Sequence, residues 1–301
     1  MEMITMIWTH SLIRSFCFSA VAIIALPAIA KPAAKEVLFS DYGVNKSPEN
    51  AEFYKEAGAS IMTVSTSGFL MPDKSDEEFA VKLAGVKNLP VKIIASNGFI
   101  GPRHLRCVGP KANHDDVLAW AETAIRRIHQ AGGKMVIFGS GGSRRVPKDW
   151  PVEKANEQFV TLLKRMGPIA KKHDVVVALE QLNSKECNYI NTIGEAASII
   201  RAVDHPNVRL LADLYHMAME GDTAEDLKKA VDLVVHVEIA EKEGRTFPGT
   251  QGDDFRPYFR VLRDAGYRAG VSIEGRGEDK EFVTAFAEIK KQAAEVMAEE
   301  K

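Results

Sequence analysis

Cysteine is scarce in this sequence. Only three of the 301 residues are cysteine, and two of them, Cys107 and Cys187, follow the first 30 residues. Two cysteines exclude a disulfide scaffold, so a hydrophobic core has to hold the fold together. One bridge and two free thiols both stay open, and neither cysteine has the spacing of a metal site.

A strong net charge is also absent. Lysine and arginine number 39 against 41 aspartate and glutamate residues, which leaves a formal net charge of −2. Proteins that bind nucleic acid carry a basic surface, so we expect no nucleic acid partner. The composition is 46% hydrophobic and 27% charged, as in an ordinary globular protein with a sizeable core.

Long hydrophobic runs are missing except near the N-terminus. The run over residues 16–30 follows Arg14 and ends in Ala28-Ile29-Ala30, a small-x-small cleavage pattern. It is shorter than the ~20 apolar residues of a membrane span. We expect residues 1–30 to be a secretory signal peptide and the mature chain to be exported, to the periplasm, with no membrane association. An uncleaved anchor is the alternative.

Short apolar runs alternate with helical patterns over residues 31–301. A capping box, Thr192 with Glu195, opens one of the helices. Eight such alternations predict a single (β/α)8 barrel, a fold that typically takes ~250 residues, with a doubly wound open sheet as the alternative. The expected strands are residues 37–40, 61–64, 91–95, 135–138, 175–179, 208–212, 233–237 and 269–273.

Four of these runs end in a carboxylate, namely Glu180, Asp213, Glu238 and Glu274. Consecutive acids are separated by about one strand-plus-helix unit, so a parallel barrel would gather them at its carboxyl end, where such barrels place active sites. Burying a carboxylate is costly unless it binds a metal or meets an opposite charge. Hard oxygen ligands suit Mn²⁺ or Mg²⁺, whereas salt bridges to loop arginines are the alternative.

The same part of the chain contains a series of recognisable motifs. They are residues 178–183, 213–217 and 236–240, followed by Gly244-Arg245, Pro248-Gly249, Gly266-Tyr267 and Ser272-Ile273-Glu274. With these motifs the chain resembles the sugar isomerase/epimerase superfamily of xylose-isomerase-like barrels, which includes hydroxypyruvate isomerase, ketose 3-epimerases and inosose dehydratase. The similarity is strong over residues 178–274 and rests on architecture alone before them.

The resemblance implies a site for one divalent metal ion, Mn²⁺ first, with Mg²⁺ or Co²⁺ as alternatives. It implies Glu180 and Glu274 as the catalytic acid–base pair. The implied metal ligands are Glu180, Asp213, Glu238 and Glu274, and the implied substrate-binding residues are His216, Glu186 and Arg245.

The third ligand position departs from the family pattern. Relatives carry His or Gln there, whereas this chain has Glu238. His236 lies two residues earlier on the same face of the strand, so we expect it ~6–7 Å deeper, packed below the metal. His236 as the ligand in place of Glu238 stays an alternative.

These residues predict an enzyme that removes the proton beside a sugar carbonyl, through an enediolate, and so isomerises or epimerises a carbohydrate. An exported lyase or hydrolase that cleaves 3-keto-glycosides by β-elimination is the second hypothesis, and the export signal favours it. A DNA-repair endonuclease would need more histidine ligands and a basic face. A non-catalytic carbohydrate-binding barrel would be expected to lose a carboxylate. The sugar and the oligomeric state, a homo-oligomer included, stay open.

Overall fold

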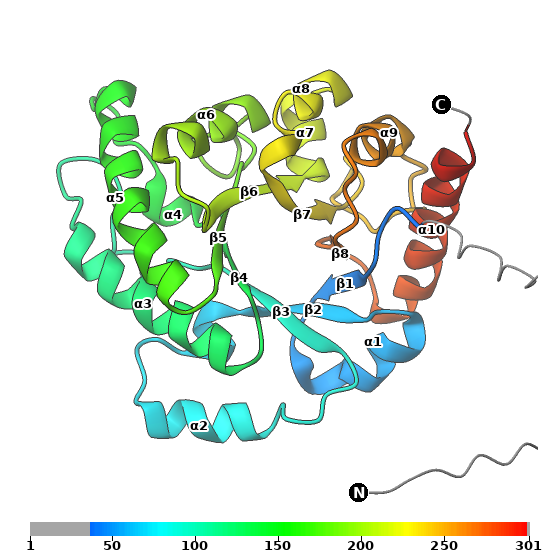
Figure 1. Ribbon diagram of the computed structural model, residues 1–301, viewed down its shortest axis with the longest axis horizontal. Coiled ribbons are helices and arrows are strands. Elements are labelled where there is room, and N and C mark those ends of the chain that lie inside the picture. The colour runs from blue at the N-terminus through cyan, green and yellow to red at the C-terminus, as the bar shows by residue number, and fades with distance from the viewer. Residues whose placement is uncertain (1–36, 300–301) are drawn as a thin grey trace, which may run out of the picture. The chain divides into compact units, whose positions relative to one another are not determined.

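The computed structural model of the protein describes residues 37–299, which form a closed barrel of parallel strands (Figure 1). Each strand pairs with the next along the chain, and β8 pairs with β1. This architecture confirms the predicted (β/α)8 fold and excludes the open sheet. The strands are β1 Tyr42–Asn45, β2 Ile61–Ser65, β3 Lys92–Asn97, β4 Met135–Phe138, β5 Val176–Glu180, β6 Val208–Asp213, β7 Val234–Ile239 and β8 Val271–Ile273.

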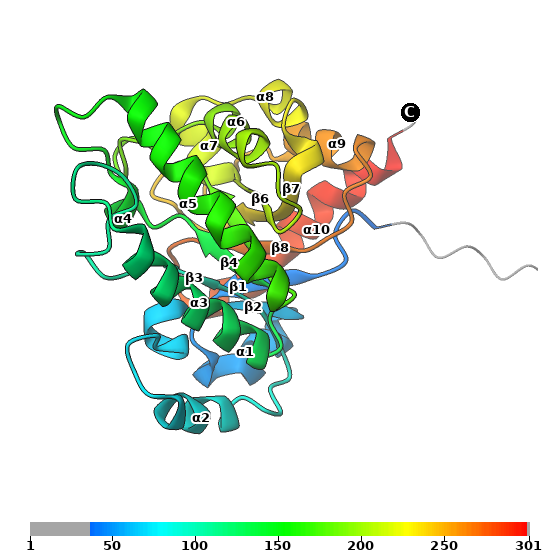
Figure 2. The same ribbon diagram turned by 60° about the vertical axis from the view of Figure 1, so that its left-hand side comes forward.

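Helices surround the barrel, and α3 packs beside α5 as α9 packs beside α10 (Figures 1 and 2). The predicted capping box is present at the start of α6, where Thr192 and Glu195 bond to each other's backbone N–H. The α-helices are α1 Ala51–Ala57, α2 Asp76–Ala84, α3 His114–Gln130, α4 Gly141–Arg144, α5 Val152–Lys172, α6 Ile193–Val203, α7 Leu214–Glu220, α8 Ala224–Lys228, α9 Arg256–Asp264 and α10 Phe282–Ala298. Shorter helical turns are η1 Pro48–Asn50, η2 Thr66–Leu70, η3 Val231–Leu233 and η4 Asp279–Glu281.

The barrel interior has its own small apolar layer, separate from the larger core between strands and helices. It consists of Ala95, Met135, Ile137, Ala178 and Leu211. Side chains alternate along a strand, so the residues two positions after Ala178 and Leu211 also point inward. Those residues are Glu180 and Asp213. The acids therefore lie one layer above an apolar floor, at the carboxyl ends of the strands.

The first predicted strand, residues 37–40, is wrong. The strand β1 begins at Tyr42, and the apolar pair before it serves the outer core instead. Leu38 and Phe39 are buried, and the Phe39 ring packs edge-on against Phe259, with the ring centroids 5.1 Å apart. The strand itself contains Gly43, because the inward side of the strand has room there for little more than a hydrogen atom. A search for apolar runs does not detect a strand with glycine at this position.

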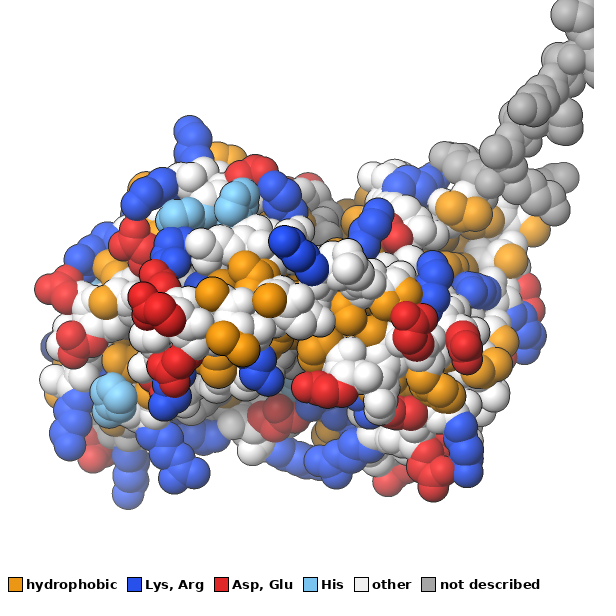
Figure 3. All heavy atoms as spheres, turned by 90° about the horizontal axis from the view of Figure 1, so that it is seen from below, with side chains coloured by type: hydrophobic (Ala, Val, Ile, Leu, Met, Phe, Trp, Pro, Cys, Tyr) orange, Lys and Arg blue, Asp and Glu red, His pale blue; other side chains and the backbone are white. Residues whose placement is uncertain are grey.

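Other expectations from the sequence concern the cysteines and the N-terminus. Cys107 and Cys187 are both buried, free thiols, so of the two possibilities left open, one disulfide bridge or two free thiols, the second holds. The predicted signal peptide, residues 1–30, lies outside the described residues. In the described part of the chain, no helix combines the length and the hydrophobicity that a membrane crossing needs. Acidic and basic side chains are interspersed on the face shown in Figure 3.

The crowding at Gly43 predicts a large effect of one methyl group. A Cβ there would meet Ser272 Oγ and lie 2.8 Å from Ile61 Cγ1. We expect Gly43→Ala to lower the free energy of unfolding by about 1–3 kcal/mol, as overpacked cores do, in urea titrations. Gly142→Ala is the matched control, because its Cβ would meet no atom within 4 Å. Equal stability of the two variants would contradict this packing.

Candidate active site

The four predicted carboxylates come together at the carboxyl end of the barrel. Glu180 and Asp213 end β5 and β6, Glu238 lies in β7, and Glu274 follows β8. One oxygen from each lies within 4.8 Å of the others. Asp213 and Glu238 are opposite each other in the β6–β7 pairing, so the backbone register itself sets two of the acids side by side. All but Glu274 are buried, and Glu274 is partly exposed.

His236 lies in the layer below these acids. Its Nε2 is 2.9 Å from Ser272 Oγ, the inward-facing residue two positions before Glu274. Complete burial lowers the pKa of His236 to about 4, so the ring is neutral near pH 7. Among the described residues, the groups with metal-ligand geometry include Glu238 and not His236. The structure therefore places Glu238 within the cluster of acids and His236 in the layer below it.

Burial and mutual repulsion disturb the protonation of this cluster. Burial, reinforced by Glu274, Glu180 and Asp213, raises the pKa of Glu238 well above its ordinary value. Burial and Glu180 raise the pKa of Glu274 to about 7, although Arg245 opposes the shift. Such a cluster is costly for the fold unless positive charge offsets it.

One arginine supplies part of that positive charge. Arg245 forms an ion pair with Glu274, and its Nη2 lies 3.6 Å from Asp213 Oδ2. The expected alternative, a salt bridge to a loop arginine, thus holds for these two acids. Within residues 37–299, however, no lysine, arginine or histidine forms an ion pair with Glu238.

The remaining oxygens are suited to a divalent cation. Asp213 Oδ2 and Glu238 Oε2 are buried and have no hydrogen-bond partner among the described residues. Unpaired buried oxygens are rare in proteins, since each forfeits its hydration. A set of four carboxylates matches the oxygen ligands that Mn²⁺ and Mg²⁺ prefer. The residues present therefore fit a divalent metal ion.

His216 lies between the acids and the loop after β5. Its Nδ1 accepts a hydrogen bond of 3.1 Å from the backbone N–H of Asn183, so the proton on the neutral ring is on Nε2. That nitrogen faces Glu180 Oε1 at 3.4 Å and Asp213 Oδ2 at 3.6 Å. Burial lowers the pKa of His216, but Asp213 and Glu180 outweigh it and raise the value to about 9. Nε2 presents a hydrogen to the acids in either protonation state.

Asp213 has a second task besides the cluster. Its Oδ1 accepts hydrogen bonds from the N–H groups of Tyr215, at 2.8 Å, and His216, at 3.2 Å. This is a helix N-cap, which starts α7 and sets His216 in place. One oxygen of Asp213 therefore builds the helix, while the other faces the centre, 3.6 Å from both Arg245 Nη2 and His216 Nε2.

Arg245 and Glu186 lie on the loop side of the cluster. Arg245 Nη1 is 3.3 Å from Glu186 Oε1, and its guanidinium lies 4.7 Å above the Tyr215 ring. Asn183 also donates a hydrogen bond of 3.1 Å to Glu186. The structure thus brings all three predicted substrate-binding residues, His216, Glu186 and Arg245, around the same centre.

Sequence reasoning missed three residues of this site. Asn45 donates a 2.8 Å hydrogen bond to Glu238 Oε1, and Asn97 donates one of 3.4 Å to Glu274. Glu241, fully buried, accepts hydrogen bonds from several backbone N–H groups over residues 249–253, which holds the loop that carries Arg245. Asn97 ends a strand and could have been found by that position. Asn45 was hidden by the misplaced first strand.

The raised pKa values predict that the metal-free protein weakens as pH rises. A carboxyl whose folded pKa exceeds its unfolded value, about 4.3, stabilises the fold fully below that value and loses this contribution as pH rises through the folded pKa. For Glu274 the folded pKa is about 7. Glu238→Gln relieves the crowding of the carboxylates. We expect its free energy of unfolding at pH 8 to exceed that of wild type by about 1–3 kcal/mol.

This comparison is made by urea unfolding with a chelator present, at pH 4.5 and pH 8. The gain should nearly vanish at pH 4.5, where the carboxyls of Glu238 and Glu274, whose pKa values are raised, are largely neutral. Glu56→Gln removes an exposed carboxylate of α1 and should change neither value. The same gain at both pH values would show that charge crowding is not its cause.

The unpaired oxygens predict that a divalent ion stabilises the fold. Adding Mn²⁺ to chelated protein at about 100 times its dissociation constant should raise the free energy of unfolding by about 2.7 kcal/mol. Glu238→Gln keeps an oxygen donor and should retain most of this rise, whereas Glu238→Ala should lose most of it. Undiminished stabilisation of Glu238→Ala would remove Glu238 from the ligand set.

Comparison with known proteins places this geometry in a family. The model of the xylose isomerase-like TIM barrel family matches residues 51–299. A 3-dehydro-D-guloside 4-epimerase of Escherichia coli is 31% identical over 162 residues, which is 52% of this chain and 62% of that relative. The chain therefore spans less than two thirds of the length of this curated relative.

Solved structures share the fold over most of the chain. A 3-keto-D-glucoside 4-epimerase from Escherichia coli superposes with a TM-score of 0.66 at 24% identity, covering 82% of this chain and 97% of that one. The IolI protein with a bound zinc atom gives 0.66 at 19% identity, covering 86% and 98%. These findings confirm the predicted resemblance, and the chain belongs to the xylose isomerase-like TIM barrel family.

Proposed function

We propose that the protein is a divalent-metal-dependent carbohydrate isomerase or epimerase that moves the proton beside a sugar carbonyl. One observation carries the proposal: two glutamates that can exchange a proton, Glu180 and Glu274, belong to a cluster of four acids with metal-ligand geometry. Family relatives that isomerise or epimerise carbohydrates support the reaction class.

Glu180, Asp213, Glu238 and Glu274 would hold the metal ion. When bound there, a divalent cation would polarise the carbonyl of the substrate and lower the cost of removing the neighbouring proton. The all-oxygen donor set favours Mn²⁺ over softer ions, and Mg²⁺ or Co²⁺ are the alternatives. Zinc in the related IolI structure supports a divalent ion in this barrel without fixing which one.

The proton is handled by the two outer carboxylates. Glu180 and Glu274 come from β5 and β8, and one oxygen of each lies within 4.8 Å of the other, so two carboxylates from different strands border a substrate carbon held at the cluster. Removal by one glutamate and return by the other inverts the carbon, and return to the neighbouring carbon isomerises the sugar.

The surrounding residues orient the substrate. Arg245, held by Glu274 and by the Tyr215 ring, presents a planar set of donors to hydroxyl and carbonyl oxygens. Glu186 would accept hydrogen bonds from sugar hydroxyls, and His216 Nε2–H would donate one. The buried floor of the barrel excludes water from below.

The 3-keto-glycoside lyase uses the same first step and differs only in what leaves afterwards. No contact in the described residues favours elimination over proton return, so isomerisation or epimerisation is the conclusion. Export to the periplasm, through the signal peptide expected over residues 1–30, remains part of this proposal.

Proton exchange with the solvent tests the reaction directly. With Mn²⁺ and a panel of ketoses and 3-keto-glycosides in deuterium oxide, wild type should exchange the proton beside the carbonyl. We expect Glu180→Gln and Glu274→Gln to lower this rate by roughly 10²–10⁴-fold, the usual contribution of an acid–base group. Nuclear magnetic resonance follows the loss of the proton signal.

Metal content and unfolding curves of both variants separate lost chemistry from lost metal or fold. Glu56→Gln, on the outside of the barrel, is the matched control and should exchange at the wild-type rate. A variant that keeps its metal and still exchanges at that rate would exclude its glutamate as an acid–base group.

A further inference from the structure

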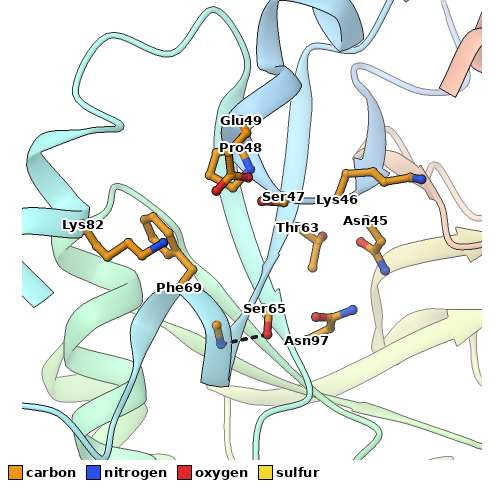
Figure 4. A pocket seen from close by; sticks show the side chains of 11 residues that line it. Asn45, Lys46, Ser47, Pro48, Glu49, Thr63, Ser65, Phe69, Lys82 and Asn97 are labelled. Atoms are coloured by element: carbon orange, nitrogen blue, oxygen red, sulfur yellow. Dashed lines mark hydrogen bonds between the residues drawn. The ribbon is translucent and has the colours of Figure 1, made fainter.

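A hollow adjoins the acid cluster through Asn45 and Asn97, which bond to Glu238 and Glu274. It is a cavity of about 320 Å³, within the usual size of a small-molecule site. In Figure 4 the side chains of Asn45, Thr63, Ser65 and Asn97 surround it from three neighbouring strands, and Phe69 lies on its far side. The catalytic proposal assigns nothing to this space.

The barrel register explains why these polar groups converge. Asn45 pairs with Thr63 across β1 and β2, and Ser65 pairs with Asn97 across β2 and β3. Paired residues point to the same side of the sheet, as do residues two apart on one strand. All four therefore face inward at the carboxyl end, in two successive layers above Gly43 and Ile61.

The polar atoms of the cavity lack partners within the protein. Thr63 is 1% exposed, and its hydroxyl has no hydrogen-bond partner among the described residues. Asn45 Oδ1 is also buried and unpartnered there, while its Nδ2 is committed to Glu238. An unpaired buried polar atom costs stability, so groups of this kind at a cavity wall indicate a ligand that supplies the missing bonds.

The cavity adds to the catalytic centre and does not repeat it. None of the four acids lines it, nor do His216, Glu186 and Arg245. It nevertheless touches the centre at two points, since Asn45 bonds to Glu238 and Asn97 bonds to Glu274. A ring held at the cluster by Glu180 and Glu274 would leave the cavity free for whatever extends from that ring.

The wall chemistry selects the extension. A hydroxyl and amide groups offer both donors and acceptors, and Phe69 adds an apolar wall. Among the charged side chains that border the cavity, Lys46 is paired with Asp279 at 2.9 Å, and Lys82 and Glu49 carry opposite charges, so the wall does not demand an anion. We propose that this cavity is a subsite for an uncharged second sugar ring, which makes the substrate of the proposed enzyme a glycoside rather than a free ketose.

Binding of two unreactive probes tests the subsite independently of turnover. With Mn²⁺-loaded full-length protein, calorimetry should show that cellobiose binds at least about tenfold more tightly than methyl β-D-glucoside, from the added hydrogen bonds. Thr63→Val keeps the shape and removes the hydroxyl, and should reduce the ratio to about threefold or less. Thr63→Ser keeps the hydroxyl and should preserve the ratio.

A matched control is Thr123→Val, on the solvent side of α3, which should leave both affinities unchanged. Equal affinity of wild type for the two probes, or binding of neither, would overturn the subsite. So would an equal loss for both probes in Thr63→Val, because the hydroxyl would then face the ring at the carboxylates.

The identification of the ligand as part of a substrate rests on the proposed function. The experiments nevertheless distinguish a wrong reaction class from a wrong subsite. If the reaction class is wrong, the affinity ratio persists while a bound 3-keto-disaccharide shows no exchange of its proton with deuterium oxide. If the subsite is wrong, exchange proceeds and the ratio is absent.

Discussion

Repulsion among four carboxylates in one layer of the barrel is the constraint on which the rest of the site depends. Strand alternation and the β6–β7 register place Glu180, Asp213 and Glu238 inward and side by side, and Glu274 follows at the end of β8. Arg245 offsets the charge at Glu274 and Asp213, but Glu238 has Asn45 alone as a hydrogen-bond partner among the described residues. A divalent cation is the component that would balance the layer, and the oxygens of Asp213 and Glu238 that lack a hydrogen bond within the described residues are suited to it.

The surrounding structure makes room for this layer and keeps it rigid. Gly139 directly follows β4 beside Glu180, where any Cβ would meet the carboxylate. Below, Ala178, Leu211 and the neutral His236 form a floor that carries no charge. At the side, the buried Glu241 accepts hydrogen bonds from backbone N–H groups of residues 249–253, which restricts the conformation of the loop that carries Arg245. Each of these features fixes the position of an acid or of its partner. The packing of the barrel therefore determines where the proposed proton transfer would take place.

The sequence predicted the barrel and the acid cluster because both depend on patterns within short stretches of the chain. An apolar run that ends in an acid indicates the end of a strand. The regular spacing of these runs indicates that the strand ends lie at the same end of the barrel. The parts that escaped prediction depend on contacts between distant segments. Gly43 is a strand residue through its pairing with Ile61 and Ser272 of the neighbouring strands, and without that strand Asn45 had no visible place beside Glu238. Glu241 has no local sequence signal, since the amides that bind it come from a later part of the loop. His236 and Glu238, by contrast, were ordered correctly in depth by strand alternation alone.

Direct observation of the ion tests the central claim, that the four carboxylates act together around one cation. Crystals of the Mn²⁺-loaded protein, measured at the manganese absorption edge, should give one anomalous peak per chain. The account predicts this peak among Glu180, Asp213, Glu238 and Glu274, with oxygen ligands and His236 in the layer beneath. A peak coordinated by His236 in place of Glu238, a peak elsewhere on the barrel, or no peak at saturating Mn²⁺ would contradict it.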